Sequence, residues 1–383
     1  MTKRLYDYDS HIKEFEAEVI DLRKEGENFL IALNGTAFFP GGGGQECDEG
    51  EINGIKVEGF FEDDGVIYHI LNKEIKIGEK VKGKINFEKR FLNMQAHSAE
   101  HVVTGLIHNL YGFDNVGFHM GSESVTLDVN GEMRDEMLRE VELLSNKVIY
   151  ENVNITVSYP DEEELKSLKY RSKLELTENV RIVTIEGYDK CACCAPHVKK
   201  TGEIGIIKLL GMEKLKGKTR ISMLSGYDAY YDYVKKFENT KGISNLLSVK
   251  PNESFEAVKK LHKELNDKNF ELVGLKREIL KLKYSNLKKD GNVVIFEEKL
   301  DTAELIFTAN LLSENNFGYV CVLSEKKDGN GFNYVIKNKE VNMRDKIKEI
   351  NASLNGRGGG SGEMVQGFFD ADKENIEKVL TNL

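Results

Sequence analysis

Residues 91–112 read FLNMQAHSAEHVVTGLIHNLYG, and this stretch decides the interpretation of the chain. Its apolar residues recur at helical spacing from Phe91 onward, and Gly112 follows them as a stop signal, so we expect one helix here. His97 and His101 stand four positions apart. Side chains at that spacing share one helix face, where two imidazoles are close enough to bind one metal ion.

A second cluster of metal-binding residue types lies almost a hundred positions downstream, in Cys193-Cys194-Ala195-Pro196-His197. A thiolate and an imidazole four apart, beside a proline that stiffens the turn, would complete a His, His, Cys, His set. Such a mixed nitrogen and sulfur set suits Zn²⁺. The ion would activate water, organise a substrate pocket, or only staple the helix to a loop.

The first cluster also fits H-x-x-E-H, the inverzincin peptidase pattern, with Glu100 as general base. A peptidase needs a downstream carboxylate as third ligand and an open coordination position. The better-spaced Cys193 and His197 pair argues against this alternative. We expect Glu100 to be a solvated helix charge rather than a base. We expect Cys191 and Cys194 to be small residues that are buried or that stand behind the metal ligands, rather than nucleophiles.

Residues 1–88 predict a small antiparallel β-barrel. Short runs of apolar alternation are separated by turns such as Asn34-Gly35 and Asp64-Gly65, which is typical of such barrels. The loop Pro40–Gln45 is the exception, because its four consecutive glycines make a poor strand but let the backbone approach another molecule closely.

Residues 89–235 mix the helical and strand periods, which predicts an α+β domain that carries the zinc site. We expect a second helix at 132–150 and strands at 124–129, 154–159, 180–185 and 204–210. The whole chain is therefore expected to be a multidomain α+β protein.

Residues 236–290 predict a helical linker or a coiled-coil arm, because apolar residues fall on heptad positions: Val258, Leu261, Leu265, Leu272, Leu275, Ile279 and Leu282. A single amphipathic helix packed on its own chain fits the pattern equally. Residues 291–383 again alternate strand and helix patterns and contain a second glycine run, Gly356–Gly362, which predicts an α/β domain with a glycine-rich loop.

The composition of the 383 residues limits the class of protein. A net charge of −10 argues against a protein that coats nucleic acid non-specifically, but not against a local basic surface. Residues 1–20 contain no apolar signal region, and no stretch approaches the ~20 apolar residues of a membrane span. Three of the five cysteines stand within four positions, which favours a metal or reactive thiols over disulfides. We expect a cytoplasmic protein with no membrane contact.

Together these motifs resemble the editing domain shared by alanyl- and threonyl-tRNA synthetases, whose zinc pattern matches His97-x-x-x-His101 followed by Cys193-x-x-x-His197. Further motifs of the alanyl branch follow in the same order: Thr36-x-Phe38-Phe39-x-x-Gly42-Gly43-Gly44-Gln45, Ile185–Asp189, Thr201–Gly205, and Gly358-Gly359-Gly360 with Gln366 and Gly367. The chain is identified as a member of the long, freestanding alanyl-tRNA editing proteins of the AlaX type. By this resemblance, residues 291–383 are similar to a DHHA1 domain.

The chain departs from the family at one motif. The family's usual Cys-Gly-Gly-Thr-His is Cys-Cys-Ala-Pro-His at 193–197, so a threonine hydroxyl is lost. Cys191 and Cys194 flank the expected thiolate and are alternatives to it. Four positions separate the motif's aspartate from its cysteine in the family, and the same count from Asp189 favours Cys193.

The resemblance implies a zinc-dependent hydrolysis of the ester in seryl-tRNA(Ala), and of that in glycyl-tRNA(Ala), without aminoacylation, because only the barrel precedes the editing domain. A synthetase pocket built for alanine cannot strongly reject such small analogues. By the same resemblance, Thr36 is a candidate partner for the serine hydroxyl, and Gln45, with Gly43 and Gly44, for the substrate carbonyl or water. The alternative for Thr36 is an ordinary exposed strand residue.

A tRNA partner requires basic surface. Lys216, Lys218 and Arg220 belong to a basic loop that we expect to guide the acceptor end through phosphate contacts, although a plain solvated loop fits as well. The family resemblance implies that Arg357 and the glycines after it, Gly358, Gly359 and Gly360, bind the tRNA body. The heptad and the resemblance suggest a homodimer through the C-terminal half. A non-hydrolytic tRNA-binding or dimerisation module is the alternative function.

Overall fold

The computed structural model describes residues 1–121, 123–172, 180–287, 291–315, 318–326 and 329–383. The chain divides into two compact units, Met1–Gly242 and Ile243–Leu383, which are described separately. Both units combine sheets with helices, which confirms the predicted α+β class; the sheet of the second unit is mixed, because two of its strands, Val293–Glu297 and Val320–Glu325, run parallel. The finer domain boundaries near residues 88, 235 and 290 stay predictions.

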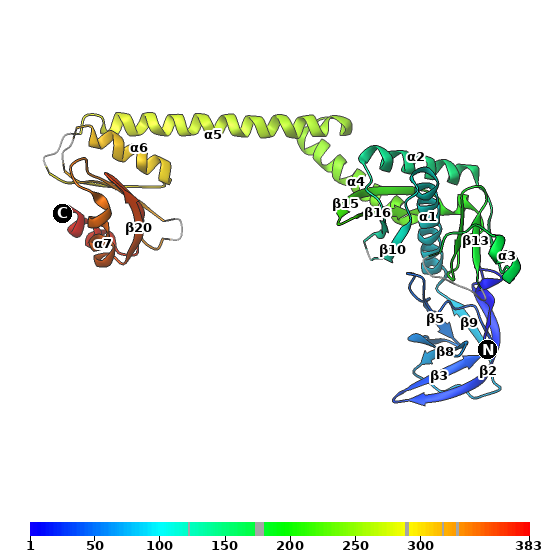
Figure 1. Cartoon of the computed structure of the whole chain (residues 1–383). Helices are drawn as coiled ribbons and strands as arrows, with labels where there is room; N and C mark the ends of the chain where they lie inside the picture. The colour runs from blue at the N-terminus through cyan, green and yellow to red at the C-terminus, as the bar shows by residue number, and fades with distance from the viewer. Residues whose placement is uncertain (122, 173–179, 288–290, 316–317, 327–328) are drawn as a thin grey trace. The chain divides into compact units, whose positions relative to one another are not determined.

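The first unit begins with a seven-stranded antiparallel sheet (Figure 1). Its strands, in spatial order, are β6 (Ile55–Lys56), β5 (Gly50–Ile52), β9 (Lys80–Ile85), β2 (Glu14–Glu25), β3 (Asn28–Leu33), β8 (Val66–Leu71) and β7 (Gly59–Asp63). Short pieces β1 (Lys3–Arg4) and β4 (Gly35–Thr36) pair beside it. The apolar run from Ile52 to Phe61 is divided among β5, β6 and β7.

The sheet curls because its long strand β2 pairs with two different strands along its length. The first part of β2 pairs with β9 and the second part with β3, and the register shifts between Val19 and Asp21. Such an irregularity bends a strand. The outermost strands, β6 and β7, are joined by two residues only: the Val57 amide donates to Gly50 and the Glu58 amide to Ile70, at opposite ends of the sheet. The inside of the curl is filled by apolar side chains, among them Phe38, Ile52 and Leu71.

The centre of the first unit is the helix α1 (Phe87–Tyr111), which confirms the helix expected from Phe91. The Asn86 side chain caps its first turn, and Gly112 ends it with φ of 71°, a conformation that favours glycine. Arg90 ties the helix to the curled sheet: it is fully buried and pairs with Asp48.

Two smaller sheets and a second helix surround α1. One sheet has the order β10 (Asn115–Met120), β11 (Val125–Val129), β16 (Lys218–Ser225) and β15 (Ile207–Leu215); the other has the order β12 (Ile155–Ser158), β13 (Ile182–Ile185) and β14 (Asp189–Ala192). The helix α2 (Asp135–Glu151) packs on α1, and the short α3 (Glu162–Ser167) is exposed. Figure 1 shows α1 between these elements.

The sequence analysis missed β10, β14 and β16. Strand β14 has the sequence DKCA, which shows no apolar alternation, and its place is fixed by pairing with β13. The basic segment expected as a loop is instead the hairpin of β15 and β16, because Thr219, Ile221 and Met223 alternate inward from β16 into the core.

The helix α4 (Gly226–Leu247) begins in the first unit. The sequence analysis predicted helix only from residue 236, so it missed the first ten residues of α4. In the second unit, α5 (Ser254–Tyr284) is a single helix of 31 residues whose heptad side chains are largely exposed, from 44% at Val258 to 83% at Leu282. Of its described residues only Leu280 and Tyr284 are buried. Most of α5 therefore does not pack on the other elements of the second unit, and within this unit the alternative of a helix packed on its own chain is wrong for most of α5.

The rest of the second unit is a five-stranded sheet covered by helices. The strand order is β17 (Val293–Glu297), β18 (Val320–Glu325), β19 (Phe332–Lys337), β21 (Met364–Phe369) and β20 (Gly356–Ser361); the helices are α6 (Thr302–Ser313), α7 (Met343–Ser353) and α8 (Lys373–Thr381). The expected glycine loop is wrong, because most of it forms the edge strand β20. A Cβ at Gly358 would lie 2.4 Å from the Tyr334 hydroxyl, so this strand needs glycine for close approach. No helix in the described residues is long and apolar enough to span a membrane.

Candidate metal centre

The structure brings together the four metal-binding side chains that the sequence analysis singled out. His97 and His101 come from α1, and Cys193 and His197 come from the segment that follows β14. One nitrogen or sulfur atom of each lies within 4.8 Å of the corresponding atom of every other. All three histidines are buried, and Cys193 is nearly so. Residues about a hundred positions apart therefore form one compact donor set.

The distances within this set match those of a tetrahedral zinc site. The Cys193 sulfur lies 3.5 Å from Nε2 of His97 and 3.4 Å from Nε2 of His197. Zn–N bonds of ~2.05 Å and Zn–S bonds of ~2.3 Å at a tetrahedral angle separate nitrogen and sulfur by ~3.6 Å. The four side chains fit Zn²⁺ in type, number and spacing.

The other ring nitrogen of each histidine is fixed by an oxygen atom. Nδ1 of His97 lies 3.0 Å from Oε1 of Gln45, and Nδ1 of His101 lies 3.1 Å from Oδ2 of Asp189. Nδ1 of His197 lies 3.0 Å from the Ser98 hydroxyl. The oxygens of Gln45 and Asp189 accept from Nδ1 and leave Nε2 of His97 and His101 for a metal. Nε2 of His197 is the nitrogen that lies beside the Cys193 sulfur. Outer contacts of this kind orient the ligands of metal sites.

The electrostatics favour a thiolate at Cys193. Burial disfavours the charged sulfur, but the imidazoles around it outweigh burial and hold the pKa of Cys193 well below its ordinary value. Burial likewise opposes a charged His101, but its bond to Asp189 holds the pKa of that imidazole well above the ordinary value. Burial lowers the pKa of His197 to about 3. A metal that binds here displaces a proton from His101, so its affinity falls in acid.

Asp189 is the most constrained group beside the donor set. Its carboxylate also accepts two bonds from Arg171, 2.7 Å from Nε and 2.8 Å from Nη2. Burial would raise its pKa, but His101 and Arg171 outweigh burial and lower the pKa to about 2. Cys191 lies close to Asp189 and His101. The spacing of His101, Asp189 and Cys191 could also hold a metal. The pairing of Asp189 with Arg171 and the burial that raises the pKa of Cys191 make this set less suited to zinc.

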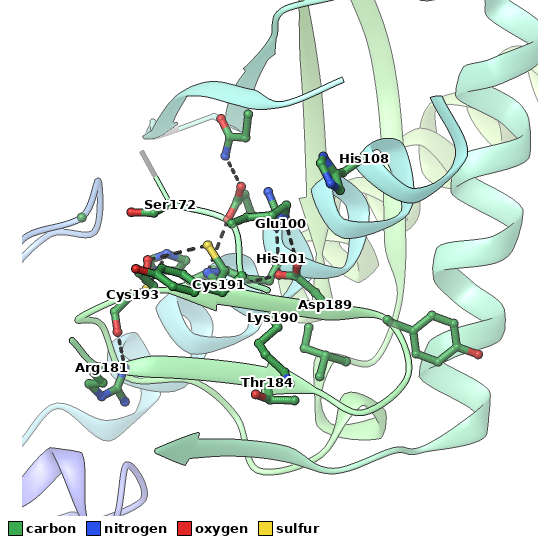
Figure 2. Close-up of a pocket in the computed structure, with 18 of the residues that line it drawn as sticks. Glu100, His101, His108, Ser172, Arg181, Thr184, Asp189, Lys190, Cys191 and Cys193 are labelled. Atoms are coloured by element: carbon green, nitrogen blue, oxygen red, sulfur yellow. Dashed lines mark hydrogen bonds and ion pairs between the residues drawn. The ribbon is translucent and has the colours of Figure 1, made fainter. Parts of the chain in front are cut away.

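A cavity of about 1540 Å³ opens beside the donor set. Three of the four donors line it: His97, His101 and Cys193. Figure 2 shows Glu100 and His101 of α1 next to Asp189, Lys190 and Cys191 of β14. A ligand in the cavity can therefore reach the donor set from one side.

Comparisons with known proteins agree with this site. Residues 180–222 match the family described as the threonyl and alanyl tRNA synthetase second additional domain. The chain is 32% identical to the alanyl-tRNA editing protein AlaX-L of Pyrococcus horikoshii, across 98% of this chain and 96% of that protein. The chain belongs to the AlaX-L family.

More distant matches are to longer proteins and to a part of one. The chain is 30% identical to an alanine–tRNA ligase of Methanococcus vannielii over 98% of its own length, but it spans only 43% of that ligase. The solved C-Ala domain of the Aquifex aeolicus alanyl-tRNA synthetase is 26% identical over 25% of this chain and 93% of that domain, with a TM-score of 0.22.

In this member of the AlaX-L family the glycine-rich loop lies over the donor set. Gln45 is 3% exposed, and its side-chain nitrogen has no hydrogen-bond partner among the described residues. Gly43 lines the cavity, and a Cβ added to it would lie 3.4 Å from the Cys194 sulfur. Gly44 has φ of +87°, and a Cβ there would lie 2.5 Å from the ring of Phe118. Close approach therefore requires glycine at Gly44, whereas at Gly43 it is the φ of +61° that favours glycine.

Thr36 is buried, so the interpretation as an ordinary exposed strand residue is wrong. Its hydroxyl lies 2.8 Å from Nε2 of His69. Nδ1 of His69 donates to the carbonyl of Ile31, and burial lowers the pKa of His69 to about 4. The ring is therefore neutral, and its Nε2 accepts a hydrogen bond from the Thr36 hydroxyl. Thr36 is not among the described residues that line the cavity.

Glu100 is also placed differently from expectation. It is 3% exposed and lines the cavity, so it is not a solvated helix charge. A sequence at helical spacing cannot distinguish a carboxylate on the outer face from one turned into a polar cavity. Cys194, expected to be buried or to stand behind the metal ligands, is exposed.

The predicted tRNA contacts lie outside the cavity. Lys216 and Lys218 are exposed on the hairpin of β15 and β16. Arg220 pairs with Asp128 through two hydrogen bonds of 2.7 and 2.8 Å, so its charge is already matched. Arg357 and the glycines Gly358, Gly359 and Gly360 belong to β20 of the second unit and are exposed.

The sequence analysis missed several residues that hold the site together. Ser98, Arg171 and Asn115 are not marked by any spacing, because each acts through a contact to a residue far away in the chain. Only Asp189 carried a signal, through its fixed distance from Cys193 in the family motif.

Proposed function

We propose that this chain hydrolyses the ester bond that links serine to tRNA(Ala) and the ester bond that links glycine to tRNA(Ala). The observation that supports it is the buried His97, His101, Cys193 and His197 set, with Nε2 of His97 and His101 free for a metal, at the wall of a large cavity. The relative AlaX-L is itself an alanyl-tRNA editing protein. The proposal extends that general activity to this chain and to two substrates.

The four side chains would hold Zn²⁺, and because four protein ligands fill a tetrahedral site, the bound ion would organise the pocket. It would supply Lewis-acid stabilisation to the substrate carbonyl once one ligand yields its position. Gln45 is proposed to position the reacting group. Its Oε1 holds Nδ1 of His97, and its buried nitrogen has no partner among the described residues. A buried donor without a partner is costly, and a substrate carbonyl or an attacking water offers it an acceptor.

Thr36 is proposed to recognise the serine hydroxyl. Its hydroxyl donates a hydrogen bond to His69 and accepts one from the Phe38 amide, 3.2 Å away. Contact with substrate therefore requires that the Thr36 bond to His69 be exchanged for one to the ligand. Replacement by valine keeps the shape of the side chain and removes this exchange, so Thr36→Val should lower seryl ester hydrolysis more than glycyl ester hydrolysis.

Two regions are proposed to bind the tRNA. Lys216 and Lys218, exposed at the tip of the hairpin, would contact phosphates near the acceptor end. Arg357 and the flat glycine strand around it would contact the tRNA body. Phosphate contacts made by a few lysines and arginines on an acidic chain predict binding that weakens steeply with salt.

The second unit is proposed to be a DHHA1-like domain, and the exposed heptad of α5 a homodimer contact. Light scattering at micromolar concentration tests this part, since a monomer contradicts it. We further propose that the protein is cytoplasmic and does not charge tRNA. An aminoacylation assay with alanine, ATP and tRNA(Ala) should give no product.

A panel of seryl-, glycyl- and alanyl-tRNA(Ala) tests the main proposal. We expect release of serine and glycine that is much faster than release of alanine, and loss of this activity when zinc is removed by a chelator. Tight tRNA binding with no release of any amino acid would favour the non-hydrolytic module instead. A peptidase requires a downstream carboxylate as ligand, and Cys193 and His197 stand in that place; cleavage of peptides but of no ester would contradict the proposal.

A further inference from the structure

Glu100 is a buried carboxylate at the cavity wall that has no role in the proposed function. Glu100 stands next to His101 on α1, is 3% exposed, and lines the cavity. It does not belong to the four-residue donor set. Carboxylates are almost never buried unless they are paired or hydrogen-bonded, so its partners show what the position requires.

Within the described parts of the chain, hydrogen bonds reach only one of its two oxygens. Oε1 accepts from the Thr104 hydroxyl at 3.1 Å and from the side-chain amide of Asn115. Both donors are buried and neutral. Oε2 accepts no hydrogen bond from the described residues; Nε2 of His101, the metal-binding atom, lies 3.8 Å from it. Oε1 is thus held by two hydrogen bonds, whereas the contact of Oε2 is the longer one to His101 (Figure 2).

The guanidinium of Arg171 does not pair with Glu100. Arg171 reaches Thr104 with one nitrogen, 2.9 Å away, but both oxygens of Asp189 take its guanidinium in a bidentate pair. Apart from the His101 ring at 3.8 Å, whose Nε2 is turned to the donor set, Glu100 therefore has no cationic side chain at ion-pair distance among the described residues. A cationic group of a ligand, placed between Oε2 and the donor set, would complete the site.

We propose that Glu100 is a specificity-determining residue whose Oε2 accepts a hydrogen bond from the α-ammonium group of the esterified amino acid. This inference rests on the proposed function and adds to it. A carboxylate can only accept, and an aminoacyl ester offers two donors: the α-ammonium, which every aminoacyl group has, and the serine hydroxyl. The ammonium is the one that carries charge.

The covalent geometry of the ester agrees with this placement. The ammonium nitrogen lies ~2.5 Å from the carbonyl carbon, since one Cα joins them. A carbonyl that faces the donor set brings the ammonium to the same wall of the cavity as Oε2, which is 3.8 Å from one of the donor atoms. An N-acylated amino acid would present a neutral amide there and leave Glu100 buried and unpaired, which is costly. The site should therefore reject N-blocked aminoacyl esters.

The test compares seryl- and glycyl-tRNA(Ala) with their N-acetylated forms, for the native protein, Glu100→Gln and the control Glu88→Gln. Glu88 is an exposed carboxylate in the first turn of the same helix. Zinc content is measured for all three. Affinities for a non-hydrolysable 3′-serylamido adenosine and its N-acetyl form give a second readout that needs no turnover.

The native protein and Glu88→Gln should prefer the free amine over the N-acetyl form by about 10- to 100-fold, as expected for a hydrogen bond to a charged group. Glu100→Gln should lose that factor on both free-amine esters, keep its rate on the N-acetyl esters, and retain zinc. An equal loss on free and acetylated esters would show a structural role and overturn the inference. A loss confined to seryl esters would show a hydroxyl contact and also overturn it.

Failure of the proposed function is distinguishable from failure of this inference. If the native protein hydrolyses no ester, the proposed function is wrong, and the two amide analogues then decide the inference by affinity. A preference of the native protein for the free-amine analogue that disappears in Glu100→Gln supports it. Equal affinities of the native protein for both analogues overturn it.

Discussion

Asp189→Asn offers a sharp test of how the donor set is held. Asp189 accepts from Nδ1 of His101 and makes two bonds to Arg171. Asparagine keeps the size of the side chain, but it removes the negative charge and offers only one acceptor oxygen. The ring of His101 should lose its fixed orientation, and Arg171 should lose its charge partner.

The expected magnitudes follow from these contacts. Loss of an outer carboxylate that orients a metal-binding histidine lowers metal affinity by about 10- to 100-fold. Removal of one partner from a buried ion pair costs about 3–5 kcal/mol; since the Arg171 side chain is 14% exposed, we expect about 3 kcal/mol of lost unfolding free energy.

The pH dependence has a definite sign. The pKa of Asp189 falls from 3.8 in the unfolded chain to about 2 in the folded chain. A lowered pKa stabilises the fold above the unfolded value and ceases to do so as the pH falls through the folded value. The shift corresponds to about 2 kcal/mol. The native protein should therefore lose this stabilisation between about pH 4 and pH 2, and Asp189→Asn should lack that part of the pH dependence.

Two measurements separate the metal effect from the fold effect. Zinc affinity is measured by competition with a chromophoric chelator, and unfolding by urea is followed in excess chelator so that metal does not contribute. Glu186→Gln is the matched control, because Glu186 is an exposed carboxylate in the turn between β13 and β14. Zinc affinity within twofold of the native value in Asp189→Asn would refute the role assigned to Asp189.

Three further predictions follow from other contacts. Cys193→Ala should abolish stoichiometric zinc binding while Cys194→Ala retains it, measured by atomic absorption after gel filtration; equal zinc content would contradict the assigned thiolate. Arg90→Met should lower the unfolding free energy in urea by about 3–5 kcal/mol, since it leaves a buried aspartate unpaired, and a loss below ~1 kcal/mol would contradict this. Gly44→Ala should slow ester hydrolysis at least tenfold with zinc retained, because the new Cβ meets a phenylalanine ring, whereas Gly26→Ala, with positive φ and open space around it, should not slow it.

The sequence predicted most where spacing alone sets geometry. His97 and His101 share a helix face because four residues make about one helical turn, and Cys193 and His197 are close because only three residues separate them. The long helix α1 and the strands with strict alternation were expected for the same reason. Strand β14 was missed, because its short polar sequence becomes a strand only by pairing with β13.

The tertiary structure alone decided which polar groups are buried and what they contact. Glu100 and Thr36 look like surface residues in the sequence, yet both are enclosed by residues from other elements. Arg220, predicted to meet phosphate, is paired with Asp128 across two neighbouring strands. Burial and hydrogen bonding depend on residues brought together from distant parts of the chain, whereas periodicity reports only neighbours along it. The sequence by itself therefore determined which residues can bind a metal, and the fold decided which nitrogen faces it, what holds each ring and where a ligand can enter.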